Sequence, residues 1–139
     1  MVLRRPRPGV AALGVRPHSH VMLQTLLQRE QRMYIAGKSD ASLEQVCASL
    51  EQSLALEPFN HDAEDTWVYA RSAGADFGFN ITRTEHMDTI ATWMPSAPRD
   101  VNYQVILSYY GTPDEAAFQR VRSALQQALH TELEVYHVA

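Results

Sequence analysis

The polar run from Glu85 to Asp88 is the best candidate in this sequence for acid–base or metal chemistry. His86 lies between two carboxylates, so three groups that can bind a metal or move a proton fall within four residues. A tetrahedral zinc site would need a fourth ligand from elsewhere in the chain, and a solvated polar loop explains the same residues more simply. We therefore treat His86 and Asp88 as weak catalytic candidates, and we expect no metal and no cofactor.

An acidic cluster between residues 57 and 65 is the second candidate site. Its carboxylates are Glu57, Asp62, Glu64 and Asp65. The cluster lacks the alternating Asp or Asn and the central Gly of a calcium-binding loop. Four interpretations stay open: a divalent-cation site, a carboxylate pair for hydrolysis, a docking surface for a basic partner, and a charged loop that keeps the protein in solution.

Trp93 is a further partner-binding candidate. It lies beside Met94 and Pro95 in an irregular stretch of the chain. Trp is enriched among the residues that dominate the binding energy of protein interfaces. The alternative is that Trp93 fills the edge of the core. We group it with the acidic cluster as the partner-binding residues of this chain.

Several common functional motifs are absent from the sequence. Gly74 and Gly78 lead into a strand pattern, so there is neither a P-loop nor a dinucleotide-binding fingerprint, and no Gly-x-Ser-x-Gly nucleophile elbow occurs. The single cysteine, Cys47, falls on the apolar stripe of an expected helix, which favours a core residue over a reactive thiol. One cysteine excludes an internal disulfide and fits a reducing compartment, so we expect a cytoplasmic protein.

Charge divides the chain into two parts. Residues 1–32 carry six Arg and one Glu, for a net charge of +5, whereas residues 33–139 carry six Lys or Arg and fifteen Asp or Glu, for −9. The basic start contains Pro and Gly, which predicts a disordered leader or an over-extended N-terminus, and residues 33–139 form one expected domain. An acidic body repels phosphate, so we expect no nucleic-acid partner. No apolar run approaches the ~20 residues of a membrane span.

The elements that must position these candidates follow from hydrophobic periodicity and helix capping. Ser42 and Gln45 form an expected capping box, and Thr112 is the expected N-cap of a second helix. The aromatic residues Trp67, Tyr69, Tyr103 and Tyr109 fall at strand spacing and are expected in the core. The predicted strands are residues 33–36, 67–71, 77–83, 89–94, 101–110 and 133–138. The predicted helices are residues 42–56 and a segment after Gly111. Residues 59–65 are expected to form a polar connection.

This order of elements predicts an α+β fold. Two helices would pack on one face of a mostly antiparallel sheet of four or five strands, as a two-layer α/β sandwich. Without the weak strand at residues 89–94, and with residues 67–83 counted as one bent strand, the order reduces to a ferredoxin-like βαββαβ arrangement or a variant of it.

Three functions fit these expectations. The first is a small, acidic, non-catalytic module that docks a basic partner protein, for example as an immunity- or antitoxin-type inhibitor, because charge complementarity speeds encounter. The second is a small dimeric ferredoxin-like enzyme whose pocket would hold His86, Asp88, Trp93 and Tyr103. The third is a structural homodimer that pairs sheet edges or faces. The absence of a catalytic constellation favours the first.

Overall fold

The computed structural model describes residues 30–64 and 67–136 of the 139-residue chain. The predicted leader as far as residue 29 and the site residue Asp65 therefore lie outside the described residues. In chain order the elements are β1 (Glu30–Gly37), α2 (Leu43–Leu54), β2 (Asn60–Ala63), β3 (Trp67–Ala73), β4 (Gly78–Thr84), α3 (Thr89–Trp93), β5 (Tyr103–Tyr110), α4 (Glu115–Leu129) and β6 (Glu134–Tyr136).

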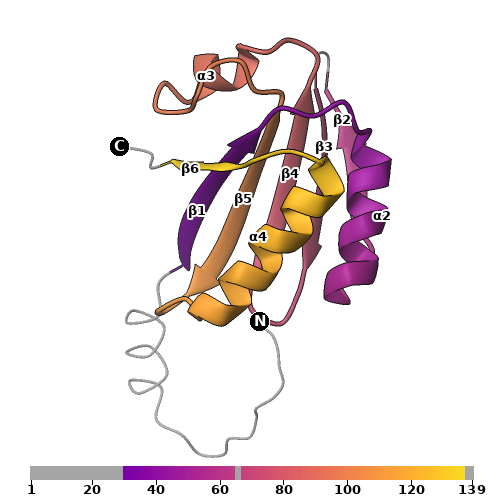
Figure 1. Ribbon diagram of the computed structural model, residues 1–139, viewed down its shortest axis with the longest axis vertical. Coiled ribbons are helices and arrows are strands. Elements are labelled where there is room, and N and C mark those ends of the chain that lie inside the picture. Colours follow the sequence, from indigo (N-terminus) through magenta and orange to yellow (C-terminus); the bar gives the residue numbers. More distant parts are fainter. Residues whose placement is uncertain (1–29, 65–66, 137–139) are drawn as a thin grey trace, which may run out of the picture.

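The six strands form one antiparallel sheet in the order β2-β3-β4-β5-β1-β6. α2 and α4 lie side by side on one face of the sheet (Figure 1). The predicted α+β class is confirmed. The predicted number of strands is too small, because β2 forms where the sequence predicted only a polar connection. All four residues of β2 are exposed, and an outermost strand needs only backbone pairing with β3, so no apolar pattern marks it.

The short helix α3 (Thr89–Trp93) lies where a strand was predicted at residues 89–94, so that prediction is wrong. Ile90 and Ala91 are buried, and Met94 packs against the same small cluster. The spacing of Ile90 and Met94 is that of one helix face. The β-branched Thr89, Ile90 and Thr92 suggested a strand, but this packing outweighs their propensity.

The first predicted helix start is confirmed and the second is wrong. Ser42 Oγ accepts a hydrogen bond from Gln45 N at 3.2 Å, and Gln45 Oε1 accepts one from Ser42 N at 3.1 Å, which completes the capping box. α4 begins at Glu115 with Asp114, not Thr112, as its N-cap. Asp caps at least as well as Thr, and its negative charge also complements the positive end of the helix dipole.

The strand register gives the sheet two different faces. The face toward the helices carries the apolar core, in which Ile35, Ile81 and Leu107 are fully buried. On the opposite face, which we call the open face, the register aligns Arg71, Asn80, Ile106 and Tyr34 across β3, β4, β5 and β1. α3 and the following loop cover one end of the open face, where Ile90, Ala97 and Val101 cluster with Ala36 and Tyr136.

Two buried polar side chains fix the loop between β1 and α2. Asn102 Nδ2 donates to Ser39 O at 2.8 Å, and Asn102 Oδ1 accepts from Ser39 N at 2.9 Å. Ser39 Oγ in turn donates to Leu129 O at 2.6 Å. The loop that starts α2 is thereby tied to the residue before β5 and to the last residue of α4. This contact network holds the helical layer in place over the sheet.

We expect Asn102→Ala to lower the free energy of unfolding by about 2 to 4 kcal/mol, because it leaves the buried N–H and C=O of Ser39 without partners. Asn60→Ala is the matched control, since Asn60 is exposed in β2, and it should change stability by about 0.5 kcal/mol or less. Urea unfolding measures both values. Equal losses of unfolding free energy in the two variants would show that the hydrogen bonds of Asn102 do not stabilise the fold.

Candidate functional site

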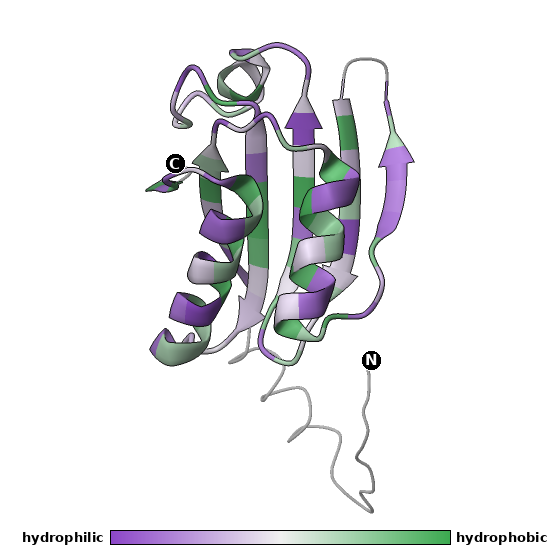
Figure 2. Cartoon of the chain, turned by 45° about the vertical axis from the view of Figure 1, so that its right-hand side comes forward, coloured by the Kyte–Doolittle hydropathy of each residue, from purple (hydrophilic) through white to green (hydrophobic). Residues whose placement is uncertain are grey.

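The carboxylates that the sequence singled out lie along the outermost strand of the sheet. Asp62 is in β2, Glu57 precedes the strand and Glu64 follows it, and all three are exposed. We call Glu57, Asp62 and Glu64 the acidic edge. Figure 2 shows β2 as a hydrophilic strand at the margin of the sheet. Among the described residues the ion pairs are Arg32 with Glu30 and Lys38 with Asp100, so no carboxylate of the acidic edge is paired.

Asp62 is held in place by hydrogen bonds at both carboxylate oxygens. Oδ1 accepts from Ala63 N at 2.8 Å, and Oδ2 accepts from the Tyr69 hydroxyl at 3.1 Å. The hydrogen bond to Asp62 raises the pKa of the Tyr69 hydroxyl above its usual value. Arg71 lies over the Tyr69 ring, 5.5 Å from its centroid. A fixed carboxylate beside an aromatic ring is therefore part of this edge.

Trp93 remains 39 % exposed. It packs edge-to-face on Trp67, with ring centroids 4.7 Å apart and ring planes at 73°. Glu64 N donates to Trp67 O at 2.8 Å, which connects these two rings to the acidic edge. We call Trp67 and Trp93 the tryptophan pair. The fold thus brings Trp93 to the Glu64 end of the acidic edge, although these two residues are about 30 positions apart in the chain. Glu57 lies at the other end of the edge, where its N donates to Ala73 O.

The sequence analysis missed Trp67 and Tyr69 as site residues because it assigned both to the core. The buried residue of β3 is Ala70, which has the opposite parity, so the neighbouring aromatic side chains point to the open face. Tyr103 is fully buried, and Tyr109 is partly buried against the core as expected. A small Ala inside an otherwise aromatic strand is the signal that could have corrected the assignment.

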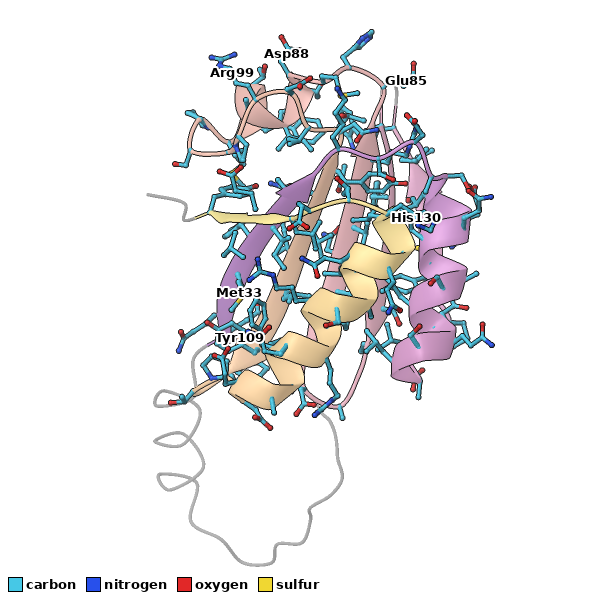
Figure 3. All side chains as sticks on the ribbon, viewed as in Figure 1. Met33, Glu85, Asp88, Arg99, Tyr109 and His130 are labelled. Atoms are coloured by element: carbon cyan, nitrogen blue, oxygen red, sulfur yellow. The ribbon has the colours of Figure 1, made fainter. Side chains whose placement is uncertain are left out.

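The residues of the enzyme hypothesis do not come together. His86 and Asp88 are exposed, and Figure 3 places Asp88 with Glu85 and Arg99 at the α3 end of the molecule. Tyr103 lies under the helices instead, where its hydroxyl donates to Ala41 O at 2.6 Å and burial raises its pKa to about 12. Within residues 30–64 and 67–136, no group of three His, Cys, Asp or Glu side chains is arranged to hold a metal ion.

Two concave surfaces formed by the described residues lie on the helical side. One, of about 720 Å³, lies between the β1–α2 loop and the end of α4, and its polar lining includes Lys38, Asp40, Gln45 and His130. A second, of about 280 Å³, lies beside the β3–β4 turn and has Leu54 and Phe79 in its lining. Neither is lined by His86 or Asp88.

No protein-family model, no curated protein and no solved structure matches this chain. In the described part of the chain, no helix has the length and apolar character required to cross a membrane.

We expect Cys47 to react slowly with thiol reagents in the folded protein. The side chain is buried in the core, and this desolvation raises its pKa from an ordinary 9.0 to about 12. A thiolate is the reactive form, so a three-unit rise lowers the labelling rate at neutral pH roughly 1,000-fold. The control is Ser53→Cys in a Cys47→Ala background, because Ser53 is exposed on the same helix. Similar iodoacetamide labelling rates at the two positions would contradict the buried assignment.

Proposed function

We propose that this protein is a small, non-catalytic binding module that docks a basic partner protein at the acidic edge. The observation that carries the proposal is the tryptophan pair, an exposed aromatic surface at the Glu64 end of the acidic edge. The three carboxylates of this edge form no ion pair among the described residues. Exposed Trp next to unpaired carboxylates suits Lys or Arg side chains, which bind carboxylates by charge and Trp faces by cation–π attraction.

The net charge of the described residues supports a basic partner. The described residues carry seven Lys or Arg and fifteen Asp or Glu, a net charge of −8. Such a field attracts cationic proteins over several ångströms and raises their association rates, while it repels acidic proteins and nucleic acids. Glu85 and Asp88 extend the negative surface toward the α3 end, where Arg99 is a nearby cation (Figure 3).

The architecture fits a ferredoxin-like core to which a binding edge has been added. β1, α2, β4, β5, α4 and β6 follow each other in βαββαβ order, and their strands lie in the order β4-β5-β1-β6. This is the strand order of a ferredoxin-like sheet. The remaining strands, β2 and β3, extend it on the β4 side, and they carry Asp62, Trp67 and Tyr69. In this proposal the additional hairpin is the functional part of the fold.

An immunity- or antitoxin-type inhibitor is the concrete form of the proposal that we favour. A cationic toxin presents a positively charged surface to its own substrate, and an acidic edge with an aromatic anchor would cover that surface. A cytoplasmic location belongs to the same proposal, because the reduced Cys47 needs no oxidising compartment.

Charge reversal of the acidic edge tests the proposal. We expect Glu57→Lys, Asp62→Lys and Glu64→Lys, combined in the full chain, to slow association with the basic partner at least about 10-fold at low salt, because electrostatic steering is lost. The measurement is quantitative affinity capture from the native host lysate, followed by association rates for the captured protein.

The matched control reverses Asp40, Asp76 and Glu132, which are also exposed and change the net charge equally. This variant should keep most of the binding. If both variants lose the partner alike, net charge and not the acidic edge drives capture. If neither does, or if the captured proteins are acidic, the proposal is wrong.

A further inference from the structure

β2 is an outermost strand of the sheet, and β3 is its one neighbour among the described residues. In an antiparallel pair, residues alternate between those that hydrogen-bond to the partner strand and those whose N–H and C=O face away from it. Glu64 N donates to Trp67 O at 2.8 Å, so Glu64 and Asp62 bond toward β3. The backbone groups of His61 and Ala63 therefore face the outer side of β2.

His61 is the residue of this outer side whose backbone is open to a partner. Asp62 Oδ1 accepts from the N–H of Ala63, and Glu51 Oε2 accepts from the N–H of Phe59, so carboxylates of the chain itself occupy the donors on either side. No described residue hydrogen-bonds to the N–H or C=O of His61, which is exposed. β2 also contains no Lys or Pro, which commonly protect such edges against pairing. His61 can thus form a reciprocal pair of hydrogen bonds with one residue of an added strand.

The acidic side chains around His61 select a basic strand. Asp62 and Glu64 are two residues apart on an extended segment, so their side chains lie on the same face of the sheet. In a strand added beside β2, the two side chains opposite these carboxylates are also two residues apart. Opposite charges at directly opposed positions of neighbouring strands stabilise a sheet. Lys or Arg at every second position therefore matches this edge.

From this register we infer that an extended, basic segment of the partner protein adds to the sheet as a strand beside β2. The inference rests on the proposed function and names the element of the partner that the acidic edge binds. In strand addition, main-chain hydrogen bonds supply affinity and alternate side chains supply specificity. A Lys or Arg opposite Glu64 also approaches the tryptophan pair, because Glu64 N is bonded to Trp67 O.

A capped heptapeptide of alternating Lys and Thr is the probe, and NMR titration of the full chain at low salt measures its dissociation constant. We expect the same heptapeptide with an N-methyl group on every backbone amide to bind at least about 10-fold more weakly, because it keeps its charge but cannot donate backbone hydrogen bonds. A heptapeptide of the same composition with its Lys residues in one block should also bind more weakly than the alternating one, because it cannot place a Lys opposite each carboxylate without placing others on the wrong face.

One pair of variants tests the role of the His61 backbone. His61→Pro removes the outward N–H and leaves the β2–β3 hydrogen bonds in place, since an edge strand tolerates Pro where the backbone N faces solvent. It should weaken binding of the alternating peptide at least about 5-fold. The matched control is His61→Ala, which keeps the N–H and should bind within about 2-fold of the unmodified chain.

The outcomes separate the two proposals. If the N-methylated peptide binds as tightly as the unmethylated one, while the combined Glu57→Lys, Asp62→Lys and Glu64→Lys variant loses both, strand addition is wrong and charge-driven docking stands. If that variant binds the alternating peptide unchanged, the acidic edge is not the site and both proposals are wrong. Absence of binding at about 1 mM alternating peptide would overturn strand addition alone, because capture of the basic partner decides the proposed function independently.

Discussion

The structure depends on one constraint: a six-stranded sheet has two faces, and the chain supplies two long helices for only one of them. The side chains of α2 and α4 complete the core on that face, with Leu50 and Leu125 fully buried. The opposite face must then be covered by another segment or remain exposed to solvent. α3 covers one end, and polar and aromatic side chains occupy the remainder.

The same constraint explains where the candidate site lies. β2 contributes nothing to the core, so its sequence is free to be acidic, and Asn60, His61 and Asp62 are all exposed. β3 buries only the small Ala70, which leaves its large aromatic residues for the open face. The tryptophan pair forms because α3 returns over the end of the sheet and places Trp93 against Trp67. The residues of the proposed docking site therefore lie in the strands that contribute least to the core.

Sequence reasoning recovered the elements whose signals are local. The Ser42–Gln45 capping box marked the start of α2, and the alternation in residues 101–110 marked β5. It missed β2, whose formation depends on backbone pairing with β3, and α3, whose short helix depends on packing against Ala36 and Tyr136. Of the candidate residues, it selected Trp93 and the carboxylates by type alone. It placed Trp67 and Tyr69 in the core, because it did not take into account the small Ala70 of opposite parity between them and Arg71.

Radical footprinting of the protein inside its native host cells, compared with the purified chain at about 1 μM, tests most directly whether the tryptophan pair is covered by a partner protein. Trp93 reports on the tryptophan pair, and His130, exposed on the helical side, is the internal control (Figure 3). The account predicts that Trp93 loses labelling in cells while His130 keeps it. Equal labelling of Trp93 in cells and in dilute solution would contradict it.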